Sequence, residues 1–113
     1  FHIHEDQALY VKGDSASGVY FVYHGELQAL DYDKEDGRLI IQEQLFSTDY
    51  SGELSALYNT PHAVTLYAVK ESQILHLTPD NFEWLITTYP KIKIYFKNSA
   101  ITRKETRKKN SPL

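Results

Sequence analysis

The chain has 113 residues, of which 42% are hydrophobic, 13% aromatic and 24% charged, and it contains neither cysteine nor methionine. This length fits one globular domain, and the lack of cysteine excludes disulfide frameworks, thiolate metal sites and cysteine nucleophiles. The net charge of −3 conceals an acidic body and a basic C-terminal segment, because residues 1–90 carry 14 acidic and 4 basic side chains, and residues 91–113 carry 1 and 8.

Up to residue 78, short runs rich in Val, Ile, Tyr and Phe are separated by Gly, Asp and Ser at spacings of about ten residues, which is typical of an antiparallel sandwich or barrel. In Val19-Tyr20-Phe21-Val22-Tyr23 nearly every position is apolar or aromatic, which favours a strand buried on both faces. The order of the strands in the sheets does not follow from these patterns. The expected strands are residues 1–4, 8–11, 19–24, 27–32, 38–44, 64–69 and 73–77.

Two helices are expected after these strands. Thr78-Pro79 predicts a helix start, with threonine as N-cap and proline at the first helical position. Pro90 then restarts or kinks the helix. Over residues 91–109, apolar side chains recur at helical spacing with lysines on the opposite face, which predicts a basic amphipathic helix.

A different pattern occupies residues 50–66, which do not follow a strand pattern. Gly52 is followed by Glu53 and one short helical turn, an arrangement that can direct several backbone N–H groups at one anion. The adjacent carboxylate can accept hydrogen bonds from sugar hydroxyls.

This segment resembles the phosphate-binding cassette of the cyclic-nucleotide-binding domain, which occurs in cyclic-nucleotide-dependent kinases, in cyclic-nucleotide-gated and hyperpolarisation-activated channels, and in catabolite activator protein. The resemblance implies an antiparallel, jelly-roll-like β-roll over residues 1–78 with a short internal cassette helix, and helices over 79–109. Because the helix before the family's first strand is missing, residues 1–113 look like one domain cut from a larger protein. The matching residues are Gly52-Glu53-Leu54, Pro61-His62-Ala63-Val64-Thr65-Leu66, Gly13-Asp14, Val19-Tyr20-Phe21-Val22 and Gly25-Glu26-Leu27.

The resemblance also implies roles for individual residues. Glu53 would accept from the ribose 2′-hydroxyl, and the amides around Gly52, Leu54 and Ser55 would help hold the cyclic phosphate. Ala63 would line the phosphate side. Family members with threonine or serine at that place tend to favour the guanine nucleotide, so alanine leans toward cAMP over cGMP.

One residue departs from the family pattern. His62 stands where the family has an arginine that pairs with the exocyclic phosphate oxygens, and histidine cannot supply that two-pronged contact. Two readings follow: a substitute ligand that binds more weakly and in a pH-dependent way, or the mark of a pocket that no longer binds cyclic nucleotides.

The last helix is similar in spacing to the helix that covers the base in hyperpolarisation-activated channels. On that resemblance Ile101 and Arg103 are capping candidates, with Arg103 on the purine. The basic run from Arg103 to Lys109 is a solvated face, a surface for nucleic acid or an anionic membrane, or a helix folded back on the acidic body. In the last case, deletion of residues 103–113 should change thermal stability or ligand response.

We therefore expect a regulatory domain, not an enzyme, with no catalytic residues, metal or cofactor. It would bind cAMP or cGMP and move its last helix to control an attached channel, kinase or transporter, located in the cytoplasm or on the cytosolic side of a membrane protein. Oligomerisation would come from the parent protein, and no nucleic acid partner is expected. The alternative is a structural coupler that binds no cyclic nucleotide or takes another small ligand.

Overall fold

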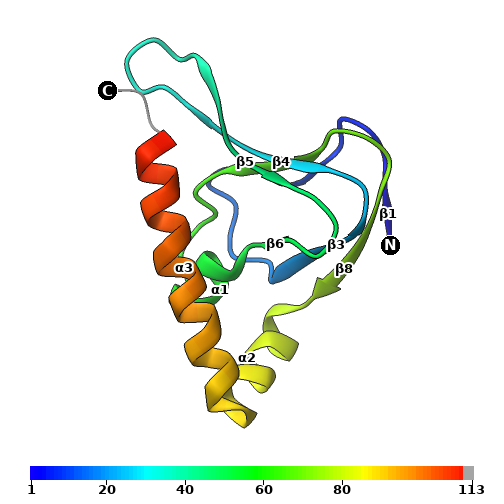
Figure 1. Cartoon of the computed structure of the whole chain (residues 1–113), viewed down its shortest axis with the longest axis vertical. Helices are drawn as coiled ribbons and strands as arrows, with labels where there is room; N and C mark the ends of the chain where they lie inside the picture. The colour runs from blue at the N-terminus through cyan, green and yellow to red at the C-terminus, as the bar shows by residue number, and fades with distance from the viewer. Residues whose placement is uncertain (111–113) are drawn as a thin grey trace.

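The computed structural model describes the backbone of residues 1–110 and the side chains of residues 1–103. Within this part of the chain, eight strands form two antiparallel four-stranded sheets (Figure 1). This arrangement confirms the predicted mainly β fold with C-terminal helices. One sheet has the order β1 (His2–Ile3), β8 (Ser72–Leu77), β3 (Val19–His24), β6 (Tyr50–Ser51), and the other β2 (Ala8–Tyr10), β7 (Thr65–Ala68), β4 (Leu27–Tyr32), β5 (Leu39–Leu45).

The main differences from the expected strands concern β6 and β3. β6 was not predicted; it is a two-residue strand in which Tyr50 pairs with Phe21 and Ser51 with Tyr20 of β3. The prediction that the β3 segment is buried on both faces is wrong at Tyr23, whose side chain is 57% exposed. The helices pack against Val19 and Phe21 near the start of β3, whereas Tyr23, near its end, lies outside this apolar cluster.

The two sheets enclose the main hydrophobic core. Strand alternation sends every second side chain inward, as in β4, where Leu27 and Ala29 are fully buried and Gln28 and Leu30, which alternate with them, are only half-buried. Burial of such side chains contributes about 1.5–3 kcal/mol each for the larger ones. The core contains Ile3, Tyr10, Tyr20, Val22, Leu27, Ala29, Leu45, Val64, Leu66, Ala68 and Ile74.

Three helices complete the fold: α1 (Glu53–Tyr58), α2 (Pro79–Thr88) and α3 (Pro90–Asn110). The predicted N-cap is confirmed, because the Thr78 side chain accepts a hydrogen bond from the backbone N–H of Asn81. α3 begins at Pro90, as the sequence predicts, since a residue before proline disfavours helical backbone. Among the described residues, no helix combines the length and the apolar character needed to cross a bilayer.

A second apolar cluster joins the helices to the first sheet. Val19, Phe82, Ile86 and Phe96 are buried together, and the Phe82 and Phe96 rings meet edge to face at 5.3 Å. α3 consequently lies along one side of the roll, beside α1 (Figure 1). This position brings side chains of α3 to the cassette.

Candidate functional site

The cassette begins at a glycine that its surroundings require. Gly52 adopts φ 99° and ψ −9°, the left-handed conformation that lets the chain leave β6 and enter α1. A Cβ atom at this position would collide with the backbone carbonyl oxygen of Gly18. The tight approach between Gly52 and β3 places the following carboxylate inside the molecule.

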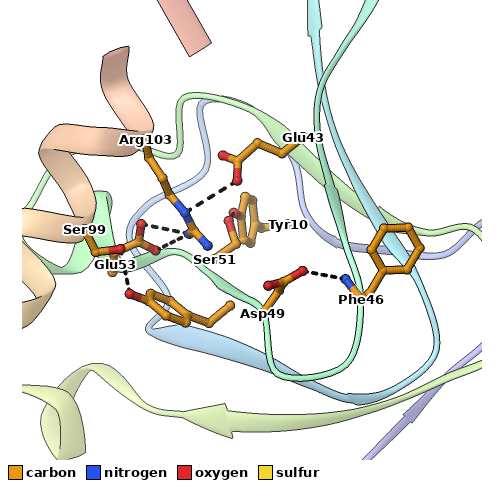
Figure 2. A network of polar contacts seen from close by, with 9 residues as sticks. Tyr10, Glu43, Phe46, Asp49, Ser51, Glu53, Ser99 and Arg103 are labelled. Carbon is orange, nitrogen blue, oxygen red and sulfur yellow. Dashed lines mark hydrogen bonds and ion pairs between the residues drawn. The ribbon is translucent and has the colours of Figure 1, made fainter. Parts of the chain in front are cut away.

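That carboxylate belongs to Glu53, whose residue is only 1% exposed. Both of its oxygens accept hydrogen bonds from Arg103 Nη1 at 2.8 Å, so α3 reaches directly into the cassette (Figure 2). Arg103 Nε also lies 3.4 Å from a carboxylate oxygen of Glu43 on β5, and the side chains of both residues are 15% exposed. A buried charge of this kind requires a partner, because removing one member leaves an uncompensated ion.

The ring of Tyr50 also packs against the Arg103 guanidinium. Its ring centroid is 4.6 Å from Arg103 Cζ, and its hydroxyl donates a 2.6 Å hydrogen bond to Ser99 Oγ. Burial raises the pKa of the Tyr50 hydroxyl, while the hydrogen bond to Ser99 acts in the opposite direction. The hydroxyl is therefore neutral at ordinary pH and available as a donor to α3.

His62 lies on the other side of the cassette, buried with 3% exposure. Its ring stacks on Tyr10 at 3.6 Å and an interplanar angle of 9°, and its Nε2 is 2.9 Å from Ser17 Oγ. Its backbone N–H donates to the carbonyl of Asp14 at 2.8 Å. The imidazole is thus held by the roll itself at the place where the family has arginine.

Between these groups the structure leaves a cavity of about 10 Å³. Pockets that hold small ligands and cofactors are commonly about 300–1,000 Å³. A nucleotide therefore does not fit in this cavity with its walls as they stand. The cavity is lined by Tyr10, Gly52, Glu53, Leu54, Ser55, His62, Ala63 and Val64.

The structure brings together most of the residues proposed from the sequence. Gly52, Glu53, Leu54, Ser55, His62 and Ala63 surround the cavity, and Arg103 joins them through Glu53. Ile101 does not join them, because its side chain is 54% exposed on another face of α3. The roles of all these residues toward a nucleotide stay predictions.

Several contacts at this site were not foreseen from the sequence. Glu43 and Tyr50 hold Arg103, whereas Tyr10 and Ser17 hold His62. Each of these pairs is separated by more than forty residues in the chain. The sequence offers only a weak signal for these contacts: the C-terminal segment is basic and the body is acidic, so the two attract each other.

Curated relatives match the same region of the chain. Lysophospholipase NTE1 of Kluyveromyces lactis is 29% identical over 90 residues, which are 79% of this chain and 6% of the relative. The NTE1 protein of Saccharomyces cerevisiae is 27% identical over 103 residues, with coverage of 82% of this chain and 6% of that relative. The chain thus spans about 6% of the length of these relatives.

Solved structures share the fold. The regulatory domain of Toxoplasma gondii PKA with cAMP is 30% identical, with a TM-score of 0.68 over 74% of this chain and 31% of that chain. The EAL enzyme Bd1971 in its cAMP-bound form has a TM-score of 0.75 at 21% identity, over 97% and 28%. A family model described as cyclic nucleotide-binding domain matches residues 1–89. With its β-roll, cassette and sequence all in agreement, the chain belongs to the cyclic-nucleotide-binding domain family.

Proposed function

We propose that this chain is the ligand-sensing domain of a larger regulatory protein and that its ligand is a cyclic nucleotide, cAMP in preference to cGMP. One observation carries the proposal: the buried carboxylate of Glu53, at the family's ribose position, is bonded directly to α3 through Arg103. A ligand at that carboxylate binds with different affinities when α3 is docked and when it has moved. Such a difference in affinity is what allows a ligand to drive a conformational change.

Affinity in this domain should be modest. His62 cannot replace the arginine fork, and a charged hydrogen bond contributes about 1.5–3 kcal/mol, equivalent to about 10-fold to more than 100-fold in Kd. Ala63 supports the preference for cAMP, since the family uses threonine or serine there for the guanine nucleotide. If Ile101 and Arg103 cap the base, both have to leave the positions described above.

The regulated protein is part of the same proposal. The matches to NTE1 proteins favour a lysophospholipase-type parent, whereas the spacing of the last helix favours a channel and the PKA match a kinase. The sequence on either side of residues 1–113 in the parent chain distinguishes these, because a preceding membrane span and a following hydrolase domain are recognisable from sequence.

Isothermal calorimetry with millimolar cAMP and cGMP tests the proposal at about pH 6 and pH 7.5, on either side of the unperturbed histidine pKa of about 6.5. We expect heat with cAMP, weaker heat with cGMP, and loss of both in Glu53→Gln. Glu71→Gln, at an exposed position outside the cassette, is the matched control and should bind as the parent chain does.

A second function, a coupler that responds to no cyclic nucleotide, is favoured by the small cavity and by the engagement of His62 with Tyr10 and Ser17. The absence of heat with both nucleotides at both pH values would refute nucleotide sensing and leave the coupler.

A further inference from the structure

Helix α3 is attached to the roll by an apolar contact and by a polar one. Phe96 and Ala100 are 5% and 1% exposed, and Arg103 follows on the same helical face, seven residues after Phe96 and three after Ala100. The Arg103 guanidinium lies against the carboxylates of Glu43 and Glu53 (Figure 2). It also lies over the ring of Tyr50. We call these four residues the α3 latch.

The latch and the proposed ligand depend on one carboxylate. Both oxygens of Glu53 accept from Arg103 Nη1 and the residue is only 1% exposed, so a ribose hydroxyl can reach this carboxylate only after a group that covers it moves away. The 10 Å³ cavity is lined by α1 and by strand and loop residues of the roll, and among the described side chains of α3 it is Arg103 that reaches it, through Glu53. α3 is part of neither sheet, so it can move without breaking a strand pair.

We propose that the latch and a cyclic nucleotide compete for Glu53, so that the nucleotide releases α3 from the roll instead of drawing it over the pocket. This inference rests on the proposed function. Glu43 and Tyr50 act as positioning residues: they hold the guanidinium from β5 and β6, and Tyr50 also bonds Ser99 one turn earlier on α3. The strength of the latch then sets how much ligand is needed for release.

The latch can be tested without any nucleotide by hydrogen exchange of the backbone amides of α3 between residues 92 and 103. Arg103→Gln should exchange there about tenfold faster or more, where tenfold corresponds to about 1.4 kcal/mol. Lys97→Gln, on an exposed position of the same helix, is the control and should leave exchange unchanged. If Arg103→Gln does not fold, Glu43→Gln weakens the latch while keeping Glu53 paired and should give a smaller acceleration. Exchange no faster than in the Lys97 variant overturns the latch.

Competition is tested by cAMP itself. Arg103→Gln removes a cation near an anion site, so electrostatic attraction alone predicts that this variant binds cAMP more weakly. Competition predicts the opposite: the variant should bind cAMP more tightly, by about the same factor by which its α3 amides exchange faster. In the parent chain, cAMP should accelerate α3 exchange. Weaker binding in the variant, or slower α3 exchange with cAMP, overturns the competition. If neither protein binds nucleotide, the proposed function and the competition both fail, and the exchange result alone decides whether the latch exists.

Discussion

Replacing His62 with arginine tests whether the pocket lacks only its phosphate-binding fork. In the structure the imidazole stacks on Tyr10 and lies 2.9 Å from Ser17 Oγ, so the substitution removes one aromatic stack and one hydrogen bond. Each contributes about 0.5–1.5 kcal/mol. We therefore expect His62→Arg to lower the free energy of unfolding by about 1–3 kcal/mol, measured by urea denaturation.

The same substitution should improve ligand binding. Arginine is longer than histidine, so its guanidinium extends past the place of the imidazole, and a side chain turned toward α1 can form the charged hydrogen bonds that histidine lacks. Those bonds are worth about 1.5–3 kcal/mol, so calorimetry should show cAMP affinity raised about 10-fold to more than 100-fold. His76→Arg is the control, because His76 is also stacked on a tyrosine, Tyr20, but lies outside the cassette and is exposed.

Loss of stability without a gain in affinity would refute this reasoning. It would mean that arginine at position 62 leaves its packed position but finds no phosphate site, which is the behaviour of a coupler. A gain of the same size in His76→Arg would equally refute it, because the effect would then be general attraction of an anion by added charge.

Three further substitutions test the packing around the site. Gly52→Ala should destabilise the chain more than Gly37→Ala in urea denaturation. Both glycines have a positive φ, which costs an alanine about 1–2 kcal/mol, but only at Gly52 would the added Cβ also collide with a backbone carbonyl. Phe96→Ala should cost about 3–5 kcal/mol, and Tyr95→Ala, at a 60% exposed side chain, much less. Tyr50→Phe should reduce the loss of stability at alkaline pH. Burial raises the Tyr50 pKa above that of the unfolded chain, which is about 10, so the stabilising contribution of the neutral hydroxyl is complete below pH ~10 and disappears as pH rises through the raised pKa. Thermal unfolding as a function of pH measures it.

Elements with a local signal in the sequence were predicted, whereas contacts between distant segments were not. β3 and β4 have the predicted bounds because runs rich in apolar and aromatic residues and the glycines at 18 and 25 mark them locally. β6 has no such signal, since its two residues become a strand only by pairing with β3 about thirty residues earlier. The cassette residues were found through a contiguous motif. The surroundings of His62 were not, because the side chains that hold it come from distant segments and share no spacing with it.

The charge split has a specific structural meaning at Arg103. The basic segment meets the acidic body where this side chain contacts Glu43 and Glu53, whereas the basic side chains after residue 103 lie outside the described residues. A desolvated ion pair is a poor source of net stability, since the cost of removing both charges from water offsets much of their attraction. Phe96 and Ala100 therefore provide the adhesion of α3. What the pair adds is a defined position for the helix, because a shift of α3 along the roll would leave a buried carboxylate without its cation. The carboxylate that defines this position, Glu53, is the one to which the proposed function assigns the ribose.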